Sequence, residues 1–275
     1  MKTTVYWANP EYQSALKAHG IDQAAGFDRL WAIEKLAVEP GNFNRGGESS
    51  VIQWSFAAKP SEQSSAAQHV FIKRQRNHLC RTWHAPFRGE PTFSREFRNL
   101  LIGLHKNLPT VRPVFYQAMN DHGVQSAILI TEDLEQGFTP LNKILPTWKD
   151  LPREDRNRII QDIALALRAL HNAGIEHRCL YPRHIFIAEK ATADSTLNDR
   201  IRLIDLEKGT RIFFDRSRAR DLETLHRRTQ KSGGPSRTDR LRFILAYLRN
   251  SPVAQGPISI SERRFICRIL NREKD

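Results

Sequence analysis

The sequence predicts an α+β protein with two lobes, a small antiparallel-sheet lobe followed by a larger helical lobe. Strand-like runs of alternating apolar residues occur in the first half of the chain, at residues 51–54, 69–73 and 112–131. Helical patterns dominate the second half, at residues 151–174, 219–230, 239–248 and 261–270. We therefore expect an N-terminal extension at residues 1–26, a sheet lobe at 27–134 and a helical lobe at 135–275.

The composition indicates a folded and strongly basic protein. The chain has 275 residues, of which 40% are hydrophobic, and this is enough to bury a substantial core. Its 43 Lys and Arg against 30 Asp and Glu give a net charge of +13, which favours contact with phosphates, nucleic acid or a membrane surface. Three scattered cysteines favour a reducing compartment. With no apolar leader and no run of about 18 apolar residues, we expect a soluble cytoplasmic protein.

The elements expected in the sheet lobe follow one another in a simple order. The first two dozen residues suggest a polar helical lead-in, and residues 43–59 suggest a turn followed by a hairpin strand. A short strand at 69–73 ends in Lys73. Residues 91–108 repeat apolar side chains at helical spacing, with Glu96 among them. Two further strands flank the turn at 120–123, and residues 132–137 are expected to form a hinge.

The helical lobe is expected to be built around one buried helix. Residues 151–174 have Pro152 near the start and Gly174 at the end, which are ordinary helix start and stop signals. Apolar residues occupy most of the helix circumference, so burial on nearly all sides is predicted. A His-Arg loop follows at residues 177–184, and then two short apolar strands at 184–189 and 201–207, the second containing Asp205 in "LIDLE".

This order of strand, lysine, helix glutamate, hinge, buried helix, His-Arg loop and "LIDLE" is similar to that of the bilobal protein-kinase-like fold. Phosphoryl transfer depends mainly on cations and geometry around the triphosphate. Lys73 is expected to reach the phosphates, Glu96 to hold its ammonium group, and Asp205 to bind the magnesium ion that bridges the phosphate oxygens. Each residue alone is weak evidence, because such residues are usually solvated. Together they predict one cleft between the lobes in which all three converge.

Three segments, "KRQRNHLCRTWHAPFRGEPTFSREFRN", "HRCLYPRHIFI" and "RLIDLEK", resemble the lipopolysaccharide kinase (Kdo/WaaP) family, and most closely its InaA-like branch. The resemblance covers roughly residues 43–228. It implies ATP and Mg²⁺ as cofactors and phosphorylation of a sugar hydroxyl in the anionic lipopolysaccharide inner core. It also implies work at the cytoplasmic face of the inner membrane, with peripheral membrane contact. His184 stands where ordinary protein kinases have a metal-binding Asn, so a metal role is implied for it.

A glycine-containing turn, "RGGESS" at residues 45–50, is the candidate phosphate loop. Gly46, Gly47 and Ser49 are its cofactor-binding candidates, because a tight turn offers backbone N–H groups to phosphate. A plain hairpin turn is an equal alternative. Phe71 shares a strand face with Lys73 and would either stack on the adenine or fill its pocket.

Cys179 stands where the catalytic Asp of kinases is expected. A thiol with a pKa near 8.5 is a poor proton acceptor at pH 7 unless Arg178 and His177 lower its pKa. We therefore take Cys179, Arg178 and His177 as catalytic candidates, with a buried and inert Cys179 as the alternative. Asp221 resembles the buried Asp that holds the catalytic-loop backbone in kinases.

Two functions follow from the sequence. The first is a lipopolysaccharide-kinase-like phosphotransferase, and the second is a pseudokinase that acts as an envelope-associated or stress-associated binding module. Nucleic-acid binding is favoured only by charge and is not expected, because no recognised module with interleaved aromatic and basic residues occurs. His69, His78, Cys80 and His84 match no common zinc spacing, so no metal site is expected there. The oligomeric state stays open.

Overall fold

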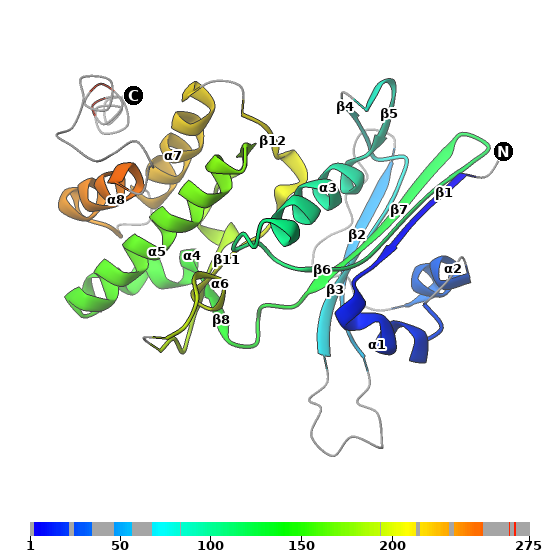
Figure 1. Cartoon of the computed structure of the whole chain (residues 1–275), viewed down its shortest axis with the longest axis horizontal. Helices are drawn as coiled ribbons and strands as arrows, with labels where there is room; N and C mark the ends of the chain where they lie inside the picture. The colour runs from blue at the N-terminus through cyan, green and yellow to red at the C-terminus, as the bar shows by residue number, and fades with distance from the viewer. Residues whose placement is uncertain are drawn as a thin grey trace, which may run out of the picture. The chain divides into compact units, whose positions relative to one another are not determined.

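A five-stranded antiparallel sheet forms the centre of the first unit of the chain in the computed structural model (Figure 1). The structure describes residues 3–21, 25–34, 47–56, 68–82, 84–192, 194–212, 215–230 and 234–249, together with Arg264 and Cys267. The chain divides into two units, residues 1–101 with 111–133 and residues 102–110 with 134–275. The first of the three boundaries between the units falls within helix α3 (Thr92–His105), after Leu101.

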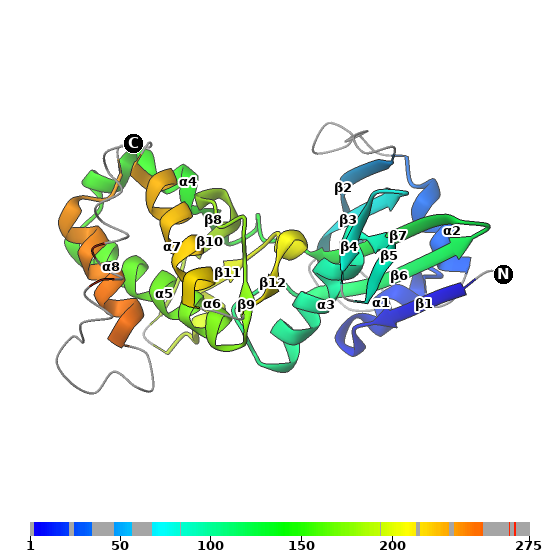
Figure 2. The same ribbon diagram turned by 90° about the horizontal axis from the view of Figure 1, so that it is seen from above.

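The strand order in the sheet is β1-β6-β7-β3-β2, with every pair antiparallel. Figure 2 shows β1 and β2 at its two edges. The elements of this unit are β1 (Thr3–Ala8), η1 (Pro10–Tyr12), α1 (Gln13–Ala18), α2 (Ala25–Ala32), β2 (Glu48–Phe56), β3 (Gln68–Arg76), β4 (Leu79–Thr82), β5 (Ala85–Pro91), α3 (Thr92–His105), β6 (Pro113–Asp121) and β7 (Val124–Glu132).

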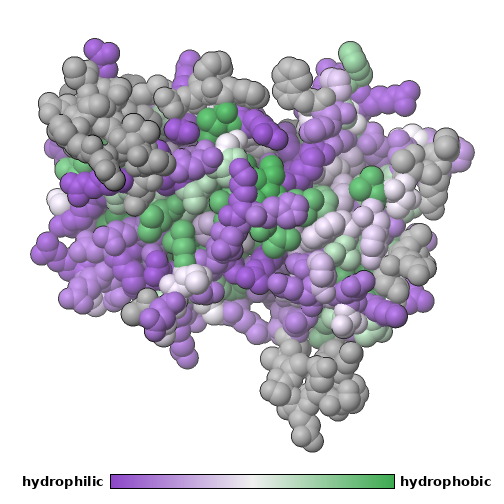
Figure 3. Space-filling model, viewed as in Figure 1, coloured by the Kyte–Doolittle hydropathy of each residue, from purple (hydrophilic) through white to green (hydrophobic). Residues whose placement is uncertain are grey.

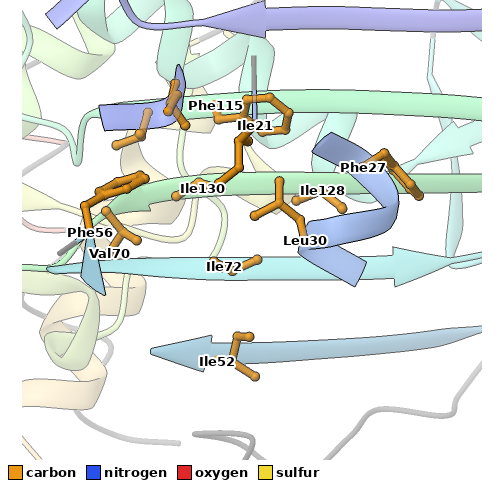
Figure 4. Close-up of a cluster of buried hydrophobic side chains, with 12 residues drawn as sticks. Ile21, Phe27, Leu30, Ile52, Phe56, Val70, Ile72, Phe115, Ile128 and Ile130 are labelled. Atoms are coloured by element: carbon orange, nitrogen blue, oxygen red, sulfur yellow. The ribbon is translucent and has the colours of Figure 1, made fainter. Parts of the chain in front are cut away.

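The hydrophobic core lies on the face of the sheet that α1 and α2 cover (Figure 4). Alternation along the strands explains this, since Val70 and Ile72 on β3 point to the same side as Ile128 and Ile130 on β7. The other members of the cluster are Leu16, Ile21, Phe27, Leu30, Ile52, Phe56, Val114 and Phe115. Helix α3 packs on the opposite face, which is also the face of Lys73.

The predicted helical lead-in is wrong for the first residues. Residues Thr3–Ala8 form strand β1, which pairs with β6 along the edge of the sheet. The segment "TTVYWA" is rich in β-branched and aromatic residues, which suit a strand, and a helix begins only later, at Gln13. The sheet is therefore extended by the N-terminal segment of the chain.

The second unit is built around α5 (Arg153–Asn172), as predicted. Ten of its residues are buried, including the charged Asp162 and Arg168. Gly174 has φ +85, a left-handed conformation that suits glycine after a helix. The other elements are β8 (Phe138–Pro140), α4 (Leu141–Ile144), η3 (Leu145–Asp150), β9 (Ile175–Glu176), η4 (Pro182–His184), β10 (Ile185–Ala188), α6 (Leu197–Arg200), β11 (Ile201–Leu203), η5 (Leu206–Lys208), β12 (Thr210–Arg211), α7 (Asp215–Gln230) and α8 (Arg237–Arg249).

Short sheets in the second unit fix its loops. Strand β10 pairs with β11 and β8, and β9 pairs with β12.

The surface seen in Figure 3 is mostly hydrophilic, with scattered apolar residues. Among the described residues, no helix combines the length and the apolar character that a bilayer span requires. The helix predicted at residues 261–270 lies almost wholly outside the described residues.

Candidate functional site

An ion pair between Lys73 and Glu96 is present in the first unit. Lys73 lies on β3, a central strand that pairs with β2 and β7 on its two sides, so the backbone that carries it is held rigidly. Its Nζ lies 2.6 Å from Oε1 of Glu96 on α3. The side chain of Glu96 is only 1% exposed and that of Lys73 18%. The expected contact is therefore formed, and the Lys73 side chain stays partly exposed to solvent.

Helix α3 places Glu96 at this position through its apolar face. The Phe97 ring stacks on Tyr116 of β6 with ring centroids 4.1 Å apart, and Tyr116 Oη donates to Ser94 Oγ at 2.7 Å. Gln75 Oε1 accepts hydrogen bonds from Thr92 and from the backbone N–H of Phe93. These contacts anchor the first two turns of α3 to the sheet. Phe71 lies half-buried on the same strand face as Lys73, and its effect on adenine stays a prediction.

The glycine-containing turn is only partly described. Gly46 lies outside the described residues. Ser49 lies within strand β2, opposite Gln75, and so is not part of a loop. A Cβ atom on Gly47 would lie 2.5 Å from the backbone of Asn77 and His78. Close backbone packing therefore explains Gly47 without a phosphate, which favours the hairpin alternative for this residue.

We predict that Gly47→Ala destabilises the protein by about 1–3 kcal/mol, because the new methyl group overlaps backbone that cannot move cheaply. Urea unfolding would measure the change, with Ser49→Ala as the matched control on the adjoining strand. The affinity for ATP, measured on folded protein, should stay unchanged. A loss of ATP affinity with normal stability would restore the phosphate-loop interpretation.

The candidate catalytic loop is held by Asp221, as the sequence suggested. Asp221 is 1% exposed and comes from α7. Its Oδ2 accepts from the backbone N–H of His177 at 2.6 Å, and its Oδ1 from that of Arg178 at 2.7 Å. The same carboxylate lies 3.1 Å from Nε2 of His171, whose Nδ1 lies 2.7 Å from Tyr247 Oη. One buried acid thus ties the loop to α5, α7 and α8.

His177 and Arg178 are positioned by their backbone. Burial lowers the pKa of His177, against the nearby Asp221 and Asp205 carboxylates, so the ring is neutral at pH 7. Its Nε2 therefore donates to the carbonyl of Ile204 at 3.0 Å, directly before Asp205. Arg178 has φ 65 and an exposed side chain. The His177 ring connects the loop to the Asp205 segment.

Cys179 is a buried and neutral thiol. It is 4% exposed, and burial raises its pKa, with Asp205 acting in the same direction and the Lys208 ammonium in the opposite one. Neither Arg178 nor His177 activates it. The structure therefore favours the inert alternative for Cys179 over a thiolate that accepts a proton.

We predict that Cys179 reacts much more slowly with iodoacetamide than Cys267, which is exposed. The reason is that the thiolate is the nucleophile, and Cys179 has both little access and a raised pKa. Mass spectrometry of labelled peptides over time, at pH 7 to 10, gives both rates from one sample. The rate at Cys179 should still be rising above pH 9. Equal labelling at pH 7 would contradict the assignment.

Asp205 and His184 lie side by side in the second unit. Oδ2 of Asp205 is 3.3 Å from Nε2 of His184, and the Asp205 side chain is 33% exposed. Asp205 has φ 61 and ψ 56, a left-handed conformation seen often at functional sites. Burial lowers the pKa of His184 to about 4, against the raising effect of Asp205. The ring is therefore neutral at pH 7, and this contact is not a charged pair.

The side chain of Asp205 has the chemistry of a magnesium ligand. The partly exposed carboxylate of Asp205 is the kind of oxygen ligand that Mg²⁺ prefers, and Mg²⁺ commonly takes one or two carboxylates and completes its shell with phosphates and water. The described residues contain no group of three or more His, Cys, Asp or Glu side chains that could hold a metal. A single protein carboxylate is therefore consistent with a Mg²⁺ ion whose other ligands are nucleotide phosphates and water. The metal role of His184 stays a prediction.

Two residues of this region, Arg183 and Lys208, were missed by the sequence interpretation. Arg183 Nε donates to His184 Nε2 at 2.9 Å, and its guanidinium group lies 5.5 Å from the centre of the Tyr181 ring. The Lys208 ammonium group opposes the rise in the pKa of the Cys179 thiol. The adjacency of Arg183 to His184 in "YPRH" was the available signal, but an exposed Arg beside a loop is ordinarily solvated.

The structure thus forms two groups of predicted residues. Lys73 and Glu96 meet in the first unit, whereas His177, Cys179, His184 and Asp205 lie together in the second. That the two groups converge on one nucleotide stays a prediction. An apolar cavity of about 50 Å³ between α4, α5, α7 and α8 has none of these residues in its lining.

Known proteins resemble this chain in sequence and in fold. The model of the lipopolysaccharide kinase (Kdo/WaaP) family matches residues 28–247. Protein InaA of Escherichia coli (strain K12) is 28% identical over 187 residues, which make up 67% of this chain and 79% of InaA. The solved structure of WaaP in complex with acyl carrier protein matches with a TM-score of 0.65 and 17% identity, over 99% of this chain and 100% of that chain. The predicted α+β, protein-kinase-like fold is confirmed.

Proposed function

Because the chain belongs to the lipopolysaccharide kinase (Kdo/WaaP) family, we propose that it transfers a phosphoryl group from ATP to a sugar hydroxyl of the lipopolysaccharide inner core. The observation that carries this proposal is the Lys73–Glu96 ion pair, formed at 2.6 Å on a central strand. A buried carboxylate is costly unless it is paired, and this pair presents a fixed cation on a partly exposed side chain. A protein with a net charge of +13 suits an anionic acceptor.

Each residue has a distinct role in this proposal. Lys73 binds the phosphates of the nucleotide, and Glu96 holds its ammonium group in place. Asp205 holds Mg²⁺, which when bound neutralises negative charge on the phosphate oxygens. Through the hydrogen bonds described above, Asp221 holds the backbone of the loop, and His177 joins the loop to the segment that carries Asp205. The proposal requires both units to serve the same nucleotide.

The acceptor hydroxyl has no carboxylate base at position 179. The Cys179 thiol stays protonated at neutral pH because burial raises its pKa. In a loose transition state most of the acceleration comes from positioning and electrostatics. We therefore expect slow transfer, in which the hydroxyl proton leaves late to water.

A pseudokinase is the second candidate, and it is favoured by the same neutral thiol. Such a protein would keep nucleotide binding, the fold and an envelope-associated binding role, but would not transfer phosphate.

Nucleotide binding is tested by thermal unfolding with ATP and Mg²⁺. The wild type should gain melting temperature, and Asp205→Asn should remove the gain at little cost in stability, because that side chain is partly exposed. Lys73→Ala should also remove the gain, measured against its own lower baseline, since it leaves Glu96 buried without its ammonium partner. A wild type that shows no gain would end the nucleotide proposal.

Transfer of radiolabel from ATP onto lipopolysaccharide core acceptors then separates the two candidates. Labelled core supports the kinase, whereas nucleotide binding without label supports the pseudokinase. We also propose that the protein works at the cytoplasmic face of the inner membrane, where it would meet such an acceptor. Fractionation of cells with and without a salt wash tests this: recovery in the soluble fraction under both conditions contradicts peripheral contact.

A further inference from the structure

Both ring nitrogens of His184 have a partner. Nδ1 lies 2.7 Å from the carbonyl oxygen of Cys179, and because a carbonyl oxygen can only accept, Nδ1 carries the proton. Nε–H of Arg183 donates to Nε2 at 2.9 Å, so Nε2 is an acceptor and carries no proton. The imidazole therefore connects the backbone of the candidate catalytic loop to a guanidinium group.

An aromatic ring also fixes this guanidinium group. Cζ of Arg183 lies 5.5 Å from the centre of the Tyr181 ring, and Cζ of Arg228, from α7, lies 4.8 Å from the same centre. Both distances fall within the range of cation–π attraction. Among the described residues, Arg183 has no hydrogen-bond acceptor other than His184, and its side chain is exposed. Its terminal N–H groups can therefore reach an anion from solvent.

A second metal ion at His184 fits this arrangement poorly. Imidazole nitrogen suits zinc, copper, iron and nickel, whereas Mg²⁺ prefers oxygen. The lone pair that a metal would need already accepts the hydrogen bond from Arg183. The cation beside His184 is thus the guanidinium group, and Asp205 lies next to the same ring nitrogen at 3.3 Å.

We propose that Arg183, oriented by His184 and Tyr181, binds the terminal phosphate of the nucleotide and takes the place of a second metal ion. The inference rests on the proposed nucleotide binding, since its ligand is the phosphate of ATP that ADP lacks. A planar guanidinium group can make two parallel hydrogen bonds to phosphate oxygens. His184 is in this account a positioning residue, and Asp205 alone holds the metal.

The test compares affinities for ATP and ADP, both with Mg²⁺, by calorimetry. Arg183→Gln should weaken ATP binding about 10-fold or more, since hydrogen bonds to charged groups are among the stronger ones, and should change ADP binding less than about 2-fold. Arg183→Lys should recover part of the loss. Arg216→Gln, an exposed arginine of α7, is the matched control and should bind both nucleotides like the wild type.

Counting bound Mn²⁺ by electron paramagnetic resonance, with a non-hydrolysable ATP analogue, gives a readout independent of turnover. The wild type should bind one Mn²⁺ per chain, and two would overturn the inference. Equal losses for ATP and ADP in Arg183→Gln, or no loss, would also overturn it while leaving the proposed function intact. A wild type that binds neither nucleotide would end both.

Discussion

Replacing Asp221 with Ala is expected to cost about 3–5 kcal/mol of stability, a large part of the 5–15 kcal/mol typical of a whole domain. The carboxylate accepts from two backbone N–H groups, those of His177 and Arg178, and faces the ring of His171. Its removal leaves these donors buried, and each unsatisfied donor costs about 1–3 kcal/mol. Because α5, α7 and α8 meet at this network, the second unit should lose cooperativity as a whole.

Urea unfolding followed by tryptophan fluorescence and limited proteolysis would measure this effect. Asp221→Asn keeps one acceptor oxygen and the shape of the side chain, so its loss should be clearly smaller. Glu154→Ala, an exposed acid in the first turn of α5, controls for loss of negative charge and should change stability little. If Asp221→Ala is within about 1 kcal/mol of the wild type, the role given to the network is wrong.

Cys179→Asp is expected to raise phosphotransfer by about 10²-fold, because a positioned general base contributes about 10² to 10⁴ in rate. The neutral thiol of the wild type does not supply this effect. The new carboxylate would be attracted by the nearby Lys208 ammonium group and repelled by the Asp205 carboxylate. Burial of the carboxylate should also reduce stability by about 1–3 kcal/mol. The variant should thus be faster and less stable.

Single-turnover transfer from labelled ATP at saturating enzyme separates the rate from the folded fraction. Cys179→Asn has nearly the same shape as Cys179→Asp and no charge, so it should show the loss of stability without the gain in rate. Activity that appears only in Cys179→Asp would also meet the expectation. A sharp fall in that variant would show that the thiol itself takes part.

Much of the fold could be predicted because its signals are local and their order is specific. The helix predicted at residues 151–174, which is α5 in the structure, has apolar residues on most of its circumference and Gly174 at its end. The pairing of Lys73 with Glu96 followed from a strand residue and a residue of the next helix, which the fold brings together. Asp221 could be predicted only by resemblance, since nothing local distinguishes it from the solvated acids of a charged helix.

The features that could not be predicted from the sequence depend on contacts between residues that are far apart in the chain. The segment Thr3–Ala8 becomes a strand because β6, more than a hundred residues later, offers a free edge. Gly47 is required by the backbone of Asn77 and His78 and not by a turn of its own. The role of Arg183 depends on the tautomer of His184, which is set by the carbonyl oxygen of Cys179.

The left-handed backbone at Asp205 and Arg178 limits how this protein can diverge. With φ of 61 and 65, both positions tolerate Gly or Asn more readily than a branched or bulky residue. A lineage that abandons phosphate transfer should therefore drift towards Asn or Gly at position 205, and Ala should be rarer because it brings strain of about 1 kcal/mol. The backbone would in this way preserve the appearance of the site after its chemistry had been lost.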